Sequence, residues 1–496
     1  MGRTTASISI AAGFLLAATT VTATSAATEP LVTEPRMVGD VGAGKLYVED
    51  AVAVGHDFAF LGTHGRERLS LRWFDAEKER ERRLRVVWSG EMPRELAAAR
   101  GGIIFTGFRE RHGTEPWRSD GTRARTRLIR EIHPGRQPML CASTTVDCGT
   151  FPAGSDPQSF VTIGRTTFFA ASDPSHGREL WRTDGTRAGT RMVMDIWPGS
   201  EPSIDSYTES LVGSRRHLYF VADDGVHGRE LWRTHGTPAS TRLVRDIGPG
   251  DSVPWWGAAP VVAGDYLYFT AEREDEGLEL WRTDGSRKRT QLVCDIWPGP
   301  RSSAPGDLTA AGDTLYFTAE DPEHGRELWR TDGSRKGTEL VTDLSPGRAS
   351  PTFGELTALK DALYVTAWDP SDELEATGDL WRVADTEAGI EPVSLGDDDP
   401  VAVARRWSEY PTAATYDDRL YLTADDGFHG NEVWVIDGSS GSSALVADIR
   451  PGPRGSRPEW LTVAADVLYL TAADGVHGRQ LWALPLADVA QGQAIR

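Results

Sequence analysis

The chain has 496 residues, 52 Gly, 29 Pro and a formal net charge of −20. This length allows one large repeat domain or two or three ordinary domains. The turn-rich composition is typical of all-β proteins and not of helical ones. The acidic charge argues against nucleic acid or an anionic membrane as the main partner.

Residues 1–27 are predicted to be a secretory signal peptide and not part of the fold. Arg3 supplies a short positive region, residues 8–23 are apolar and rich in small side chains, and residues 23–27 offer cleavage sites. The apolar stretch is short and diluted with Thr, and no later segment approaches a membrane span. We therefore expect a secreted, periplasmic or cell-surface protein.

A repeated unit of 44 to 64 residues fills the rest of the chain, and its clearest copy is residues 315–347, LYFTAEDPEHGRELWRTDGSRKGTELVTDLSPG. A period near 50 falls in the range of propeller blades. One Trp of the unit recurs in all nine copies, and we interpret it as a structural residue that packs between blades. After a degenerate first copy at Trp73, these are Trp117, Trp181, Trp232, Trp281, Trp329, Trp381, Trp434 and Trp482.

Each unit divides into four short β-prone runs. In the sixth unit these are residues 307–311, 314–319, 326–332 and 339–344. The breaks contain Gly, Asp-Gly or Pro-Gly, which favour tight hairpins and stop a ladder from continuing. No window has a sustained 3.6-residue apolar period, so we expect no helices. Four antiparallel strands per unit predict a propeller blade.

The two ends of the repeat region each carry part of a unit. Residues 37–41 resemble the fourth strand at 191–196, whereas the last unit, around Trp482, stops before its own fourth strand. Pairing these ends would close a ring and remove two exposed edges. The sequence predicts an all-β fold, a single β-propeller of about nine four-stranded blades over residues 28–486, closed by the N-terminal strand. Eight blades, an open superhelix and two smaller rings are the alternatives, and residues 487–496 form a C-terminal tail.

The motif ELWRTDGT at 179–186 recurs nearly unchanged in four units, and residues 223–250 read DDGVHGRELWRTHGTPASTRLVRDIGPG. This repeat resembles the bacterial family named for its ELWxxDGT repeat, over essentially all of the chain after the signal peptide. The resemblance implies an exported repeat protein. The family carries no established activity that could be transferred, so the resemblance implies no catalytic residue.

An insertion at residues 136–157 separates the second and third units. Cys141 and Cys148 close a short loop within it, and we expect them to form a disulfide in an exported protein. Cys294 lies in a strand-like run and is predicted to be a buried free thiol. Neither the Cys spacing nor neighbouring His residues support a zinc site.

A His-Gly pair occupies the same turn in seven of the nine units. One His per blade would spread these side chains around the ring, whereas a metal ion needs ligands within about 2–2.6 Å. We therefore interpret them as turn-stabilising residues and expect no cofactor, with calcium at the Asp-rich loops as the alternative. Recurrent charge pairs, such as Glu327 with Arg330, are interpreted as salt bridges. The His residues are His64, His112, His176, His227, His324, His429 and His477.

Aromatic residues outside the repeat pattern indicate a binding face. They fall in connections between one blade and the next, which share a face of a propeller with the His-Gly turns. Exposed aromatics there suit stacking on sugar rings or gripping a peptide; alternatively, they fill gaps at the blade tops. The candidate ligand-binding residues are Trp197, Trp255, Trp256, Trp297, Trp407, Trp460 and Tyr207, with Tyr410 beside them.

We expect a non-catalytic propeller, monomeric, that binds a carbohydrate or protein ligand on the face formed by the interblade loops. The alternatives are a propeller glycoside hydrolase or polysaccharide lyase, and a structural envelope or matrix component. No nucleophile elbow, zinc-protease, phosphate-loop or dinucleotide fingerprint occurs in a supporting context. A carboxylate pair without a sequence pattern would still suffice for glycoside hydrolysis.

Overall fold

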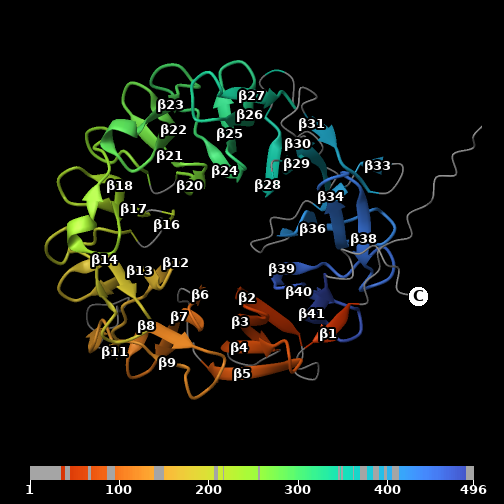
Figure 1. The fold of residues 1–496 in the computed structure, drawn as a ribbon, viewed down its shortest axis with the longest axis horizontal. Coiled ribbons are helices and arrows are strands. Elements are labelled where there is room, and N and C mark those ends of the chain that lie inside the picture. Colours follow the sequence, from red (N-terminus) through yellow and green to blue (C-terminus); the bar gives the residue numbers. More distant parts are fainter. Residues whose placement is uncertain are drawn as a thin grey trace, which may run out of the picture.

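The computed structural model describes residues 35–38, 45–64, 69–86, 95–138, 150–205, 211–215, 217–254, 257–344, 347, 350–360, 362–368, 377–383, 390–395, 399–400, 402–404 and 413–486. Nine of the sheets that they form are blades arranged in a ring around a central channel, as Figure 1 shows. The first strand of each blade faces the channel and the fourth lies at the rim. The predicted nine-bladed β-propeller is therefore confirmed. The predicted signal peptide and the C-terminal tail lie outside the described residues.

The first three blades are β2 (Leu46–Val54), β3 (Asp57–His64), β4 (Ser70–Asp75) and β5 (Arg80–Val86); β6 (Leu96–Ala99), β7 (Gly102–Arg109), β8 (Gly113–Ser119) and β9 (Arg127–Leu128); and β12 (Gln158–Ile163), β13 (Thr166–Asp173), β14 (Gly177–Thr183) and β15 (Arg191–Met192). The next three are β16 (Val212–Gly213), β17 (Leu218–Asp223), β18 (Arg229–Thr234) and β19 (Arg242–Leu243); β20 (Val261–Ala263), β21 (Tyr266–Arg273), β22 (Gly277–Thr283) and β23 (Gln291–Cys294); and β24 (Gly306–Ala311), β25 (Thr314–Asp321), β26 (Gly325–Thr331) and β27 (Glu339–Thr342).

The seventh blade is β28 (Thr352–Leu359), β29 (Ala362–Trp368), β30 (Thr377–Val383) and β31 (Ile390–Pro392), and the eighth is β35 (Ala413–Tyr416), β36 (Arg419–Ala424), β37 (Glu432–Asp437) and β38 (Ser443–Ala447). The ninth is β39 (Glu459–Ala464), β40 (Val467–Ala473), β41 (Arg479–Pro485) and β1 (Arg36–Val38). Two single-turn 3₁₀ helices, η1 (Pro238–Ser240) and η2 (Arg287–Arg289), lie between the third and fourth strands of the fourth and fifth blades.

The ninth blade closes the ring. Strand β1 pairs antiparallel with β41, and Met37 lies opposite Trp482. Figure 1 shows these two segments, from opposite ends of the chain, side by side. The predicted pairing of the N-terminal strand with the last blade is therefore confirmed for residues 36–38, while residues 39–41 lie outside the described part of the chain.

Two small additions interrupt the repeat. The insertion after the second blade contains a hairpin of β10 (Arg136–Pro138) and β11 (Thr150–Pro152); Cys141 and Cys148, between its strands, are outside the described residues. The seventh blade gains a fifth strand, β34 (Ala402–Ala404), paired with β30, and a hairpin of β32 (Ser394–Leu395) and β33 (Asp399–Pro400) lies between β31 and β34 in the chain. No helix in the described part of the chain is long and apolar enough to cross a bilayer.

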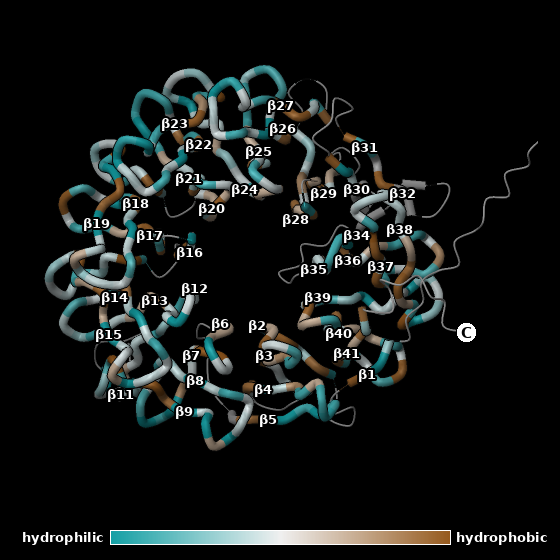
Figure 2. The backbone as a smooth tube through the Cα atoms, viewed as in Figure 1, coloured by the Kyte–Doolittle hydropathy of each residue, from teal (hydrophilic) through white to brown (hydrophobic). Residues whose placement is uncertain are grey.

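The core lies between neighbouring blades, where both faces of each sheet are covered. Trp232 of the fourth blade shares a cluster with Phe168 and Leu180 of the third, and Trp482 of the ninth blade shares one with Tyr421 of the eighth. All of the repeat Trp after the first lie in such a cluster, most of them buried and Trp329 and Trp381 half-buried. In Figure 2 the loops at the rim beside β14, β22 and β26 are largely hydrophilic.

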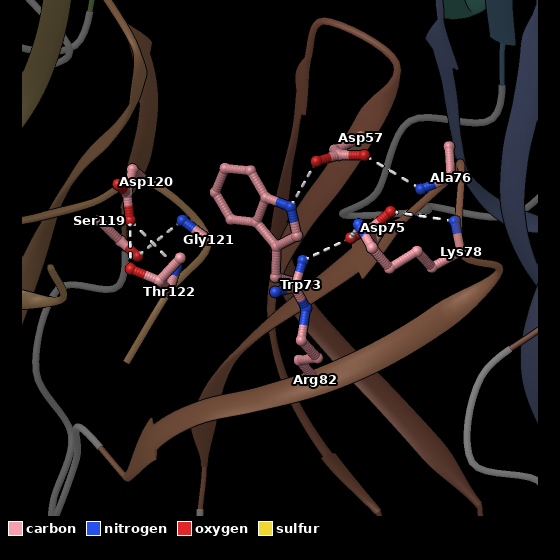
Figure 3. A network of polar contacts seen from close by, with 10 residues as sticks. All are labelled: Asp57, Trp73, Asp75, Ala76, Lys78, Arg82, Ser119, Asp120, Gly121 and Thr122. Carbon is pink, nitrogen blue, oxygen red and sulfur yellow. Dashed lines mark hydrogen bonds and ion pairs between the residues drawn. The ribbon is translucent and has the colours of Figure 1, made fainter. Parts of the chain in front are cut away.

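Figure 3 shows how the first blade meets the second. The ring of Trp73 donates from Nε1 to Asp57 at 2.7 Å and lies beside the turn of residues 119–122. A Cβ on Gly121, which has a φ of +82°, would stand 2.6 Å from the Trp73 ring. The glycine of the Asp-Gly turn is therefore needed both for its backbone conformation and for the close packing of the blades.

Candidate binding site at the channel mouth

The Glu of the ELW motif is a buried anchor at the start of the third strand. Glu432 accepts hydrogen bonds from the main-chain N–H groups of Ile449 (3.2 Å) and Arg450 (3.1 Å) and from the Ser456 hydroxyl (2.6 Å). These donors lie in the connection to the next blade, so the carboxyl group holds that connection over the sheet. Burial raises the pKa of five such groups to about 7, namely Glu115, Glu179, Glu230, Glu279 and Glu432.

The sixth blade uses its Glu in the same way, and Arg330, predicted to pair with Glu327, pairs with Glu339. Glu327 accepts from the N–H of Leu344 at 3.1 Å, and Arg330 forms an ion pair with Glu339 at 2.6 Å. The Glu of the motif is thus used for main-chain anchoring, and the Arg three residues later binds a carboxylate on the neighbouring fourth strand.

The His-Gly turns of the later units lie between the second and third strands, whereas His64 is the last residue of β3 and lies 3.4 Å from Glu81. Asp426 accepts from the N–H groups of Phe428 (2.9 Å) and His429 (2.7 Å), and its other oxygen binds His429 Nδ1 at 2.6 Å. The same Asp–His pair, three residues apart, occurs in five blades. These contacts are those of a turn-stabilising pair, and Asp224 raises the pKa of His227 in the same way. The pairs are Asp173–His176, Asp224–His227, Asp321–His324, Asp426–His429 and Asp474–His477.

An Arg two residues after the His reaches back toward the first strand of its own blade. Arg178 donates to the Gln158 side chain at 2.7 Å, and Arg479 donates to Glu459 at 3.2 Å. In the sixth blade, Arg326 donates to the Thr318 hydroxyl at 3.3 Å. These side chains therefore bind residues of the first or second strand of their own blade.

The fifth blade departs from this pattern. Leu278 stands where four other blades have Arg, and its side chain is 1 % exposed. A cavity of about 630 Å³ lies here, lined by the fifth blade (257–259 and Leu278), the sixth (304–309) and the seventh (Gly354 and Leu356). Their inner strands β20, β24 and β28 face the channel in Figure 1. Because Leu278 is short and apolar, the space that an Arg would occupy is left open.

The turn of the fifth blade is also different. Arg273 and Glu276 replace the usual Asp and His and form an ion pair at 2.8 Å, with the charges reversed. The turn is preserved while its chemistry changes. The sequence EREDEGLELW at residues 272–281 already contains both departures.

Asp307 is the carboxylate of this cavity. It is exposed, and it lies in a bulge of β24 with a φ of +52°, where the pairing register shifts between Gly306 and Thr309. Its Oδ2 accepts a hydrogen bond from the Thr318 hydroxyl at 2.9 Å. A non-Gly residue with positive φ is uncommon, and here it holds a hydrogen-bonding group at the rim of an otherwise small and apolar lining.

The three described aromatic residues that were predicted to bind a ligand, Trp197, Trp297 and Trp460, lie in different parts of the ring. Trp197 is half-buried and packs on the next blade, because a Cβ on Gly225 would stand 2.7 Å from its ring. Trp297 is half-buried with the Arg301 guanidinium 5.3 Å from the ring centre. The prediction for Trp460 needs correction: it belongs to β39, is 8 % exposed, and donates to the Val48 carbonyl. The remaining candidates lie outside the described residues: Trp255, Trp256, Trp407, Tyr207 and Tyr410.

Other predictions concern metals and thiols. Cys294 is a free thiol, half-buried, and burial raises its pKa. Within the described ranges, no group of three His, Cys, Asp or Glu side chains is arranged to hold a metal ion. The sequence analysis missed Leu278 and Asp307, although the change from Arg to Leu before ELW was a visible signal.

The strand pairing places this chain among the β-propellers, with nine blades. No protein-family model matches its sequence, and no curated protein is similar to it. The resemblance to the ELWxxDGT-repeat family therefore stays a prediction.

Among solved structures, the chain is similar to a puromycin hydrolase (15% identity over 68% of this chain and 53% of that chain, TM-score 0.38). It is also similar to a prolyl endopeptidase (12%, 88% and 54%, TM-score 0.42) and to an oligogalacturonate lyase in complex with manganese (12%, 66% and 87%, TM-score 0.37). The chain spans about half the length of the first two proteins.

Proposed function

We propose that this protein is an exported, non-catalytic β-propeller that binds a carbohydrate or protein ligand at the channel-mouth cavity of the fifth to seventh blades. The observation that carries the proposal is the cavity at Leu278, which stands at the position from which Arg178 and Arg479 reach the inner strands of the third and ninth blades. The volume of about 630 Å³ lies within the range of small-molecule sites. Export is supported by the signal-like residues 1–27.

The lining suits one sugar unit or one side chain of a peptide. Ala258, Leu308 and Leu356 offer small and apolar contacts, against which the apolar face of a sugar ring can pack. Asp307 supplies a hydrogen-bond acceptor for a hydroxyl group or for a cationic side chain. The net charge of −20 further favours a neutral or cationic ligand.

The carboxylate content of the lining favours binding over hydrolysis. Most glycoside hydrolases use two carboxylates about 5–10 Å apart. Among the residues that line this cavity, Asp307 is the one acidic residue. A glycoside hydrolase or polysaccharide lyase is the competing function, and the same ligands assayed for product release distinguish it from binding.

A glycan array and a peptide array, followed by titration calorimetry of the best ligand, test the proposal. Leu278→Arg should abolish binding by filling the cavity, and the fold should tolerate it because Thr270 occupies the position of Thr318, the partner of Arg326. Asp307→Ala should weaken binding by about ten-fold through the loss of a hydrogen bond to a charged acceptor. Asp313→Ala, at the far end of the same hairpin, is the matched control.

Unchanged binding in a folded Leu278→Arg variant would show that the ligand binds elsewhere. Release of reducing sugar or of an unsaturated product, lost in Asp307→Ala, would show that the protein is an enzyme and would overturn the non-catalytic function. If a peptide is the best ligand, the natural ligand is a protein and not a carbohydrate.

A further inference from the structure

A second cavity lies on the turn between the second and third strands of the second blade. Its volume is about 400 Å³, and it shares no lining residue with the channel-mouth cavity. Its lining is basic, although the whole protein is strongly acidic. The lining residues are Arg109, Glu110, Arg111, His112, Trp117 and Leu128.

This turn breaks the rule that five other blades follow. Three residues before its His, the second blade has Arg109 in place of the Asp that pairs with His elsewhere. His112 instead binds Glu131, with 3.0 Å between Nδ1 and Oε1. The fifth blade also has an Arg at this position, but Arg273 is neutralised by Glu276.

Arg109 is consequently a cation that no carboxylate in the described part of the chain neutralises. Its guanidinium lies 5.4 Å from the centre of the Trp117 ring, a cation–π contact that fixes its position and leaves its N–H groups for another partner. The side chain is half-buried at the wall of the cavity. An Arg held in this way is prepared to bind a planar anion, because its N–H donors match the two oxygens of a carboxylate.

The charges around Arg109 limit the negative charge of the anion that the cavity can bind. Arg111 and Glu110 are both exposed at the tip of the turn, and His112 is engaged with Glu131. The lining therefore has one positive charge in excess. The rest of this acidic molecule repels a polyanion more strongly than a small ligand with one negative charge.

We propose that the cavity at Arg109 is a binding site for a small ligand that carries one carboxylate group. Arg109 binds the carboxylate through two N–H donors, and Arg111 attracts it at the entrance. The site is independent of the channel-mouth cavity, so either proposal can fail without the other.

Titration calorimetry with glucuronate and with glucose tests the site, because the two sugars differ in one carboxylate. The unaltered protein should bind glucuronate and not glucose at Arg109. Arg109→Asp should weaken glucuronate binding by at least about ten-fold, as expected when a charge-assisted bond is lost. This variant restores the Asp–His spacing found in five blades, so it should remain folded.

Arg123→Asp is the matched control, since Arg123 is exposed on the turn that leads to the fourth strand of the same blade and undergoes the same change of charge. It should bind glucuronate like the unaltered protein. Equal affinity for glucuronate in Arg109→Asp, no binding of glucuronate by the unaltered protein, or binding of glucose that Arg109→Asp abolishes would each overturn the proposal. Tighter binding of inorganic sulfate than of glucuronate would also overturn it, because the site would then be a general anion site.

Discussion

The indole Nε1 of Trp460 donates a hydrogen bond to the main-chain oxygen of Val48 at 3.1 Å. The two residues are 412 positions apart in the sequence and lie on the inner strands of the ninth and first blades. Together with the pairing of β1 and β41, this bond joins the two ends of the propeller at the inner edge as well as at the rim. The ring is therefore closed at both its inner and its outer edge.

Removing the donor at the inner edge should weaken the closure. Trp460→Phe keeps a large apolar ring but leaves the Val48 oxygen without this partner, so we expect a loss of about 1–3 kcal/mol in the free energy of unfolding. Equilibrium denaturation in urea measures it. Trp297→Phe, at a half-buried Trp, should change the free energy by less than about 0.5 kcal/mol. Equal losses in the two variants would contradict a special role for Trp460.

The strand at the rim should matter for the same reason. Val38 is 8 % exposed and packs in the cluster with Leu46 and Phe58 of the first blade. Val38→Asp places an unpaired charge in that cluster and should cost about 3 kcal/mol or more. It should also increase aggregation, because a released β1 leaves the edge of β41 unpaired. Differential scanning calorimetry and light scattering measure the two effects.

Arg36→Gln provides the comparison for this variant. Arg36 lies in the same strand but is exposed, and its ion pair with Glu79 is exposed as well. Pairs of this kind contribute about 0–1 kcal/mol. A melting temperature that falls as far in Arg36→Gln as in Val38→Asp would indicate that the strand acts through its charge and not through its packing.

The buried Glu residues predict a pH dependence of stability. Burial raises the pKa of Glu432 from 4.5 to about 7. The folded protein therefore binds more protons than the unfolded protein between these values. The contribution of this group is complete below pH 4.5 and is lost as the pH rises through 7. Unfolding free energies at pH 5 and pH 8 should differ less in Glu432→Gln than in the unaltered protein, whereas Glu201→Gln, on an exposed connection, should leave the difference unchanged.

The Asp of the His-Gly turn should contribute equally to the free energy of unfolding in different blades. Asp426 and Asp474 each accept two main-chain N–H groups and the Nδ1 group of their His. Each Asp→Ala change should cost about 1–2 kcal/mol, and the double variant should show the sum, because each Asp acts within its own turn. Urea denaturation of the three variants checks this. A large deviation from the sum would mean that neighbouring turns are coupled.

The ring and its closure could be predicted because they depend on patterns that repeat. The fourth-strand pattern at Met37 had no unit before it, and the unit at Trp482 lacked one, so pairing them followed from simple matching. The position of Trp460 could not be predicted in this way. It has a φ of +60° in a bulge of β39, an uncommon conformation for an aromatic residue, and this turns a side chain near the connection into the core.

The channel-mouth cavity was predictable in part. The substitution of Leu278 for Arg is visible when the units are aligned. Its consequence depends on a contact that the sequence does not show, namely the reach of Arg178 and Arg479 to the inner strands of their blades. The structural effect of a substitution within a repeat can therefore be inferred only when the contacts of the usual residue are known.

The split composition of the ninth blade also bears on how the protein is made. Strand β1 is translated before all the other strands of the propeller, and its partner β41 is translated after them. At ordinary rates of synthesis the interval is on the order of half a minute or more. During that time β1 has no strand to pair with. A nascent chain released before β41 is synthesised would contain the first eight blades without the pairing that closes the propeller.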